Sequence, residues 1–232
     1  MGALLDLVFP PRCAGCDLPG TLLCARCEGA ILRIDQAYAC LRCGAPLVVG
    51  GCAECGERAF AFSAVRCAAL LAPPVSRAVV VLKDAGERRY AAVLAVLLAE
   101  AAAGWLCADD VLVPVPASPQ ALRRRGFDHA ADIARELGRS TGLPVKRALG
   151  ATRTADQRSL GRADRFVNRS GAFCVSLGVV PPRRVVLVDD VFTTGATLDS
   201  AARVLRAAGA AEVRALAVAR SCRAGPRAIE LA

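Results

Sequence analysis

The 232-residue sequence predicts an α/β protein in which helices flank a parallel sheet, with a small cysteine-rich domain in front of it. Three observations support this fold class. From residue 61 onward, runs of apolar β-formers alternate with helical stretches. One run, Val185–Val188, is apolar throughout, which is typical of a parallel strand buried on both faces. Eight of the twelve cysteines lie before residue 56, so we expect a first domain at residues 1–60 and a second at residues 61–232.

The first domain contains four Cys-x-x-Cys knuckles. A gap of two residues lets both thiolates of one turn reach the same tetrahedral ion, and two knuckles complete a set of four sulfurs that suits Zn²⁺. We therefore predict two closed structural zinc sites, built from Cys13, Cys16, Cys24, Cys27, Cys40, Cys43, Cys52 and Cys55. Because the four knuckles fall within 43 residues, metal binding is favoured over the alternative, a redox role for a single knuckle.

Two pairings of the knuckles are open at this point. Sequential pairing leaves seven residues between the first two knuckles and eight between the last two, whereas interleaved pairing leaves 23 and 24. We favour sequential pairing, which the sequence alone does not settle. The segment has few large apolar residues, so its folding is expected to depend on the metal.

The other four cysteines have no knuckle spacing, and we expect them to be small buried apolar residues: Cys67, Cys107, Cys174 and Cys222. The amino terminus has no basic n-region, and Asp6 and Pro10 interrupt its apolar run. A secreted disulfide scaffold is therefore excluded as an interpretation, and we expect a cytoplasmic protein with reduced thiols.

Strands and helices alternate along the second domain. The predicted strands are Val65–Leu71, Val111–Val115, Phe173–Ser176, Val185–Val188 and Val213–Ala219. The predicted helices are Pro73–Leu82, Arg88–Ala103, Ala130–Arg139, Ala155–Arg165 and Ala196–Ala208. Gly86 is expected to end the first of these helical segments.

One apolar segment has to be distinguished from a membrane span. Ala91–Ala108 is nearly all apolar apart from Glu100. Its many alanines, Gly104 and the adjoining acid pair at 109–110 favour a core helix instead, so we predict no membrane span.

The most informative segment follows the predicted strand Val185–Val188. Asp189 and Asp190 are expected at the carboxyl end of this strand, where open α/β sheets bind their ligands. Next come the hydroxyls of Thr193, Thr194 and Thr197, with Gly195 among them, at the start of a helix. Backbone N–H groups at a helix start bind phosphate, and glycine permits close approach. Because the two carboxylates would repel a phosphate, we expect them to hold ribose hydroxyls or Mg²⁺. The segment therefore predicts a site for a phosphorylated ribose.

A second group follows the predicted strand Val111–Val115. After Pro-Val-Pro we expect a basic loop, Arg123–His129, that contains Gly126. Arginine offers planar donors and glycine permits backbone N–H contacts, which suits a leaving pyrophosphate. His129 is the single histidine, and we consider it as a general base. The favoured alternative is that Asp128 caps a helix that begins at His129.

A third group is the polar stretch Arg153–Leu160, which continues to Arg162, Arg165 and Asn168. Two interpretations are open. The stretch forms a lid that closes over a bound anion, or a helix whose arginines face solvent or nucleic acid.

The basic residues are concentrated in one part of the chain. The net charge is +9, and residues 123–184 alone hold fourteen basic and five acidic residues. Such a local excess favours binding of phosphates, pyrophosphate or nucleic acid over an unspecific basic surface.

These motifs resemble those of known families. Residues 185–197 resemble the 5-phosphoribosyl-1-pyrophosphate (PRPP) signature of type I phosphoribosyltransferases, and Arg125-Gly126-Phe127 resembles the pyrophosphate loop of adenine-type members. With the cysteine knuckles and the Lys83–Gly86 turn, the whole chain resembles the ComF family, which includes ComFC-type and GntX-type proteins. It departs from that family's pattern at Asp128-His129, where Asn-Gln is frequent, and at Asp84-Ala85.

The resemblance implies a type I phosphoribosyltransferase-like sheet domain after a double zinc ribbon. It implies binding of PRPP with Mg²⁺ by Lys83, Arg125, Gly126, Asp189, Asp190, Thr193, Thr194, Gly195, Ala196 and Thr197, with Asp189, Asp190 and Arg125 as the catalytic residues. It also implies a role in natural transformation, on single-stranded DNA and with a helicase partner. The alternative is a non-catalytic DNA-handling protein that uses the fold as a scaffold or as a PRPP-regulated module. The short tail after Ala219 offers no recognisable pocket for an acceptor base.

Overall fold

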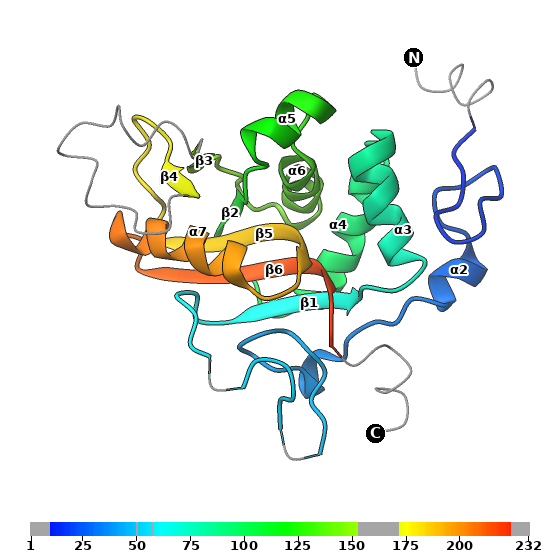
Figure 1. Cartoon of the computed structure of the whole chain (residues 1–232), viewed down its shortest axis with the longest axis horizontal. Coiled ribbons are helices and arrows are strands. Elements are labelled where there is room, and N and C mark those ends of the chain that lie inside the picture. Colours follow the sequence, from blue (N-terminus) through cyan, green and yellow to red (C-terminus); the bar gives the residue numbers. More distant parts are fainter. Residues whose placement is uncertain (1–9, 50, 57, 153–171, 224–232) are drawn as a thin grey trace.

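A computed structural model describes residues 10–49, 51–56, 58–152 and 172–223, and its central element is a four-stranded parallel sheet (Figure 1). The strands are β1 (Val65–Leu70), β2 (Val111–Pro114), β5 (Arg184–Phe192) and β6 (Glu212–Arg220), in the order β1-β6-β5-β2. The two strands in the centre, β5 and β6, are buried almost along their whole length, as their apolar composition predicts.

Helices cover both faces of this sheet. One face is covered by α3 (Val75–Val80), α4 (Tyr90–Ala101) and α6 (His129–Thr141), and α3 continues into the π-helix η2 (Val81–Ala85). The other face is covered by α7 (Ala196–Ala207). Alternate residues of β5 explain the two layers, because Val186 and Val188 pack with α4 and α6, and Val185 and Leu187 pack with α7. The predicted fold class is thus confirmed.

The cysteine-rich segment divides between the two faces. Its regular elements are short, α2 (Ala25–Gly29) and the 3₁₀-helix η1 (Gln36–Tyr38). Ala14 and Ile31, from the first half, belong to the core of α3 and α4, whereas Cys43 and Phe62 belong to the core of α7. Figure 1 shows the first half beside α3 and the second half beyond β1, near the end of β6.

The strand that carries the acid pair is longer than predicted. Asp189 and Asp190 were expected after the end of the strand, but β5 continues to Phe192. The reason is its unequal neighbours. On one side β2 ends at Pro114, opposite Val188, whereas on the other side β6 stays paired to β5 as far as Phe192. The two acids therefore lie within the strand but beyond the carboxyl end of β2.

Two further predictions need correction. Phe173–Ser176 is a strand, β4 (Phe173–Val175), but it pairs antiparallel with β3 (Leu149–Ala151) in a separate two-stranded sheet. The basic segment before Gly126 is a helix, α5 (Pro119–Arg125), rather than a loop, because Ser118 caps its start and Gly126 ends it with φ +76°. The predicted helix Ala155–Arg165 lies outside the described residues.

Two expectations concern apolar segments and free cysteines. The helix within Ala91–Ala108 is α4, a core helix, and within the described part of the chain no helix is long and apolar enough to span a membrane. Of the four remaining cysteines, Cys67 is buried as expected and Cys174 and Cys222 are half-buried. Cys107 is exposed, because it lies in the turn that leads into β2.

Candidate functional site

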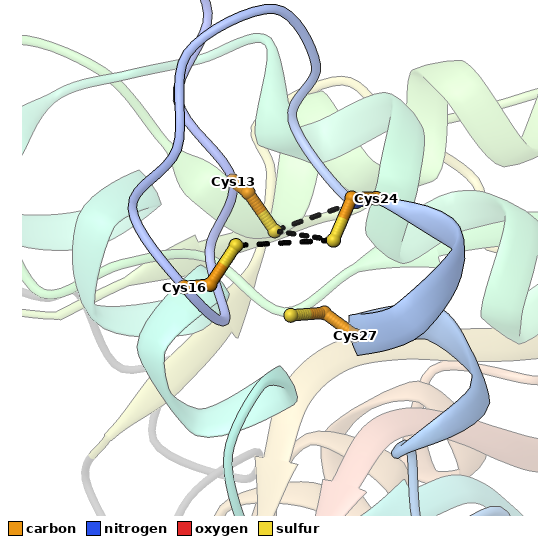
Figure 2. A group of neighbouring side chains, drawn as sticks. All are labelled: Cys13, Cys16, Cys24 and Cys27. Carbon is orange, nitrogen blue, oxygen red and sulfur yellow. Dashed lines mark hydrogen bonds between the residues drawn. The ribbon is translucent and has the colours of Figure 1, made fainter.

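The first four knuckle cysteines converge on one point (Figure 2). The Sγ atom of Cys24 lies 3.6 Å from that of Cys13 and 3.8 Å from that of Cys16. A tetrahedral zinc ion with Zn–S bonds of ~2.3 Å requires sulfurs about 3.8 Å apart. These distances fit a four-thiolate zinc site and exceed the ~2.05 Å of a disulfide bond.

The other four knuckle cysteines form a second group of the same kind. Cys40 and Cys55 have sulfurs 3.8 Å apart, and the sulfurs of Cys43 and Cys52 are 3.5 Å apart. The structure thus pairs the knuckles sequentially, so the first zinc ribbon is Cys13–Cys27 and the second zinc ribbon is Cys40–Cys55.

Each ribbon holds one thiol that ionises readily. Burial opposes ionisation of Cys13, but backbone hydrogen bonds from Cys16 and Cys24 outweigh it and lower the pKa of Cys13 to about 6. In the second ribbon, backbone hydrogen bonds from Cys55 and Glu54 likewise overcome burial and lower the pKa of Cys52 to about 7. Burial raises the pKa of another thiol in each group, to about 12 for Cys27 and about 11 for Cys55. Thiolates are the form that binds zinc, so metal binding would release protons from these thiols.

The acid pair of β5 meets residues from two other elements. Lys83, on η2, forms an ion pair with the Asp190 carboxylate. His129, the first residue of α6, places Nε2 3.5 Å from Asp190 Oδ1. The Asp189 carboxylate accepts a hydrogen bond from the backbone N–H of Asp190 at 2.9 Å. The pair is almost completely buried, so its charge acts in a medium that screens it weakly.

The two carboxyl groups have opposite pKa shifts. Burial and the neighbouring Asp190 charge raise the pKa of Asp189 well above its ordinary value. Burial would also raise the pKa of Asp190, but the hydrogen bond from His129 and the charge of Lys83 outweigh it and lower the pKa. Asp190 therefore loses its proton more readily than Asp189.

The side chains of the acid pair and His129 could together hold a divalent cation. One atom from each of His129, Asp189 and Asp190 lies within 4.8 Å of the others. His129 Nδ1 is buried and has no hydrogen-bond partner among the described residues. Carboxylate oxygens suit Mg²⁺, and a bound cation or sugar hydroxyl would have polar partners here.

A loop rich in threonine, Thr193–Thr197, joins β5 to α7, and we call it the threonine loop. Thr193, Thr194 and Thr197 are exposed, as is Ala196, the first residue of α7. The first N–H groups of a helix have no partner within it, so the loop presents hydroxyl and N–H donors together. Gly195 has φ +79°, and a Cβ there would come within 2.6 Å of Phe192 and 2.8 Å of Phe60. Only glycine fits this turn without displacing its neighbours.

Arg125 and Gly126 lie at the end of α5. Arg125 Nη2 lies 3.3 Å from Asp84 Oδ1, and Asp84 follows Lys83 on η2, so Arg125 is linked to the acid pair through that short helix. Arg125 Nε is buried without a partner among the described residues. Two ion pairs, Arg125–Asp84 and Lys83–Asp190, thus join the basic end of α5 to the acid pair, because Lys83 and Asp84 are neighbours in η2.

The sequence did not predict the contacts that two residues, His129 and Arg220, make at this site. Asp128 does cap α6, through a 3.2 Å bond from the Ala131 N–H, but His129 also reaches Asp190. The available signal was a single histidine two residues after the Arg-Gly-Phe motif. Arg220, at the end of β6, donates a hydrogen bond to the Thr193 carbonyl of the threonine loop, and no sequence pattern indicated this role. The group Arg153–Leu160, with Arg162, Arg165 and Asn168, lies outside the described residues.

Comparison with protein families agrees with this architecture. Residues 4–69 match the double zinc ribbon domain and residues 109–228 match the phosphoribosyl transferase domain. The chain is a phosphoribosyltransferase-domain protein with an amino-terminal double zinc ribbon, and the ribbons identify their metal as zinc.

Three similar proteins indicate to which family of phosphoribosyltransferase-domain proteins the chain belongs. The chain is 31% identical to the DNA utilization protein YhgH of Escherichia coli K12 over 229 residues, which cover 93% of this chain and 99% of that protein. It is 37% identical to Competence protein F of Haemophilus influenzae over 119 residues, 48% of this chain and 51% of that protein. It is 30% identical to Competence protein ComFC of Streptococcus pneumoniae over 109 residues, 47% of each. The match thus spans about half of the two competence proteins. The chain belongs to the ComF family.

Proposed function

We propose that this protein binds PRPP with Mg²⁺ at the carboxyl end of β5, transfers its phosphoribosyl group, and acts in DNA uptake in the cytoplasm. One observation carries the proposal: a buried acid pair, a lysine and a threonine loop at a helix start all lie at the same edge of the sheet. The donors and acceptors are those that a phosphorylated ribose requires.

In this proposal each group has a separate role. The threonine loop holds the 5-phosphate, and Asp189 and Asp190 orient the ribose through its 2- and 3-hydroxyls. Mg²⁺, held by the acid pair, would neutralise charge on the pyrophosphate. Lys83, Arg125 and Gly126 stabilise the negative charge that develops on the departing pyrophosphate. The raised pKa of Asp189 supports this assignment, because a bound cation would offset the repulsion between the two carboxylates.

Calorimetric titration with PRPP, with and without Mg²⁺, tests the binding step on protein of known zinc content. We expect saturable binding that needs Mg²⁺ and that falls at least tenfold when Asp189→Asn and Asp190→Asn are combined. Asp109→Asn is the matched control, because its side chain is 70% exposed and lies at the opposite end of the sheet. Unchanged PRPP affinity in the double variant would refute the role of the acid pair.

Turnover is tested by pyrophosphate release with a panel of bases and nucleosides as acceptors. Release that requires both PRPP and an acceptor supports the transferase reaction. Binding without release under all acceptors leaves PRPP as a regulatory ligand and refutes catalysis for that panel.

The second candidate function is non-catalytic handling of single-stranded DNA, together with a helicase partner. It is favoured by the names of the relatives and by the excess of nine positive charges between Arg123 and Arg184. Phosphate contacts of this kind predict an affinity that falls steeply with salt. DNA binding at several salt concentrations, compared in the presence and absence of PRPP, separates this function from the transferase reaction.

A further inference from the structure

The second zinc ribbon is followed by residues that contact the threonine loop directly. Arg58, three residues after its last cysteine, donates an Nη1–H to the Thr194 carbonyl at 3.0 Å. Phe60 lies against Gly195, since a Cβ on that glycine would come within 2.8 Å of its ring. The backbone N–H of Ala61 donates to the Asp199 carboxylate in the first turn of α7 at 2.6 Å. The segment thus touches both the loop and the helix that it begins.

Arg220 joins the ribbon to the same loop from the end of β6. Its side chain is 3% exposed, and Nε donates to the carbonyl of Cys43 at 2.9 Å. Nη1 donates to the carbonyl of Thr193 at 3.0 Å. One planar guanidinium therefore holds the backbone of a zinc-ligand residue and the backbone of the threonine loop at a fixed separation.

The ribbon in turn orients Arg220. Glu54, in the last knuckle, places Oε2 3.5 Å from Arg220 Nη2. Its Oε1 accepts a hydrogen bond from the Arg223 backbone N–H at 2.9 Å. The guanidinium also lies over the Phe192 ring, 4.9 Å from its centroid. The knuckle thus orients Arg220 together with Phe192 and the Ser221 carbonyl, which accepts from Nη1.

A pocket borders the polar contacts between the second ribbon and the threonine loop. About 430 Å³ of space lies between the ribbon and the loop, with Glu54 and Arg58 on one side and Thr193 and Thr194 on the other. Phe60 and Phe192 pack against the loop at Gly195, and the arginine bonds hold the carbonyls of Thr193 and Thr194, which border this pocket. The carbonyl oxygens of the loop are kept in place by the two arginines.

We propose that Arg220 is a positioning residue for the threonine loop, and that the second zinc ribbon is thereby a part of the phosphate-binding site. The inference rests on the proposed function for its ligand, and on the contacts above for its geometry. When its carbonyls are fixed on the ribbon side, the loop presents its hydroxyls and N–H groups on the opposite side in one arrangement. The first zinc ribbon has no such contact among the described residues and contacts α3 and α4 instead.

The test uses the full-length zinc-loaded protein and two readouts. Hydrogen exchange of residues 193–197 reports the order of the loop without any ligand, and calorimetry with PRPP and Mg²⁺ reports affinity. The variants are Arg220→Lys, which keeps the charge but loses the planar fork, and Arg58→Ala, an exposed change that leaves the core intact. Arg33→Ala is the control, because Arg33 also donates to a backbone carbonyl beside a zinc ligand, that of Glu28 directly after Cys27 of the first ribbon.

We expect Arg220→Lys to speed exchange of the loop and weaken PRPP binding by about tenfold each, because a bond from a charged donor is lost. Arg58→Ala should change both severalfold in the same direction, and Arg33→Ala should change neither. The inference is overturned if loop exchange in Arg220→Lys and Arg58→Ala equals that of the wild type. If the wild type fails to bind PRPP, the proposed function falls, and the exchange rates alone decide this inference.

Discussion

The two zinc ribbons have nearly the same cysteine spacing, yet they contact different parts of the molecule. The first ribbon lies against helices, with the Gly15 carbonyl accepting from Arg77 at 2.6 Å and the Arg12 carbonyl accepting from the Tyr90 hydroxyl. The second lies against the threonine loop, through Arg220 and the segment that begins at Arg58. The two ribbons also belong to cores on opposite faces of the sheet.

The difference shows that a repeated metal motif need not have a repeated role. The same four-cysteine pattern forms both zinc sites, but the role of each depends on partners far away in the chain. Arg220 lies 177 residues from Cys43, and Tyr90 lies 78 residues from Arg12. We therefore expect damage to the second ribbon to affect ligand binding, and damage to the first to affect mainly stability.

The largest effect is expected from removing one zinc ligand in each ribbon. Cys13→Ser removes the first ligand of the first ribbon, and Cys40→Ser removes the first ligand of the second ribbon. Both cysteines are buried, and each variant should lower the zinc content from two ions to one. Each should cost several kcal/mol in stability, less than the ~10–16 kcal/mol that zinc contributes to isolated finger peptides. The sheet domain explains the smaller cost, because it keeps its own core. Zinc analysis and thermal unfolding measure both changes.

Ligand binding then separates the two variants. Cys40→Ser should weaken PRPP binding at least tenfold, whereas Cys13→Ser should change it by less than about threefold. Equal weakening in both variants would contradict the comparison, because it would mean that loss of either zinc disturbs the whole molecule alike.

An intermediate effect is expected at the contact between the second ribbon and the loop. Gly195→Ala should destabilise the protein by about 3 kcal/mol, since it combines a left-handed backbone with a clash against Phe60 and Phe192. Gly142→Ala is the control, because Gly142 has a similar φ of +73° but open space around its Cβ position. It should cost only about 1 kcal/mol. Chemical unfolding of both variants isolates the clash, and equal costs would show that Phe60 and Phe192 simply move aside.

The sequence could predict the parts of this site that are local. The buried strand, the acid pair, the glycine turn and the start of α7 are contiguous in the chain, so periodicity and turn chemistry suffice to place them. The start of α5 was also predictable, because a serine at the cap position followed by a proline at the first helical position is typical of a helix start. The prediction of a loop rested on the arginines and Gly126 that follow, and not on this helix start.

What the sequence could not predict is the set of contacts between distant segments. His129 reaches Asp190 only because α6 lies against β5 and β2, and its position after a capping residue is equally compatible with exposure. Arg220 is the last residue of a strand that is buried from Val213 onward, whereas an arginine at a strand end would be expected to be exposed. Its partners are backbone carbonyls, which carry no side-chain signature. Such contacts depend on the packing of the ribbon, which no local pattern encodes.

The smallest effect is expected where the first ribbon joins α4. Tyr90→Phe removes the hydroxyl that donates to the Arg12 carbonyl and should cost about 1 kcal/mol, the net contribution of an ordinary hydrogen bond. Tyr38→Phe is the control, since Tyr38 is the one other tyrosine and its side chain is 69% exposed. Thermal unfolding should show a small loss for Tyr90→Phe and none for Tyr38→Phe. PRPP affinity should stay unchanged in Tyr90→Phe, because the first ribbon reaches helices rather than the threonine loop. A loss of affinity in this variant, without loss of zinc, would mean that the first ribbon also acts on the ligand site, through the helices that lead to Lys83.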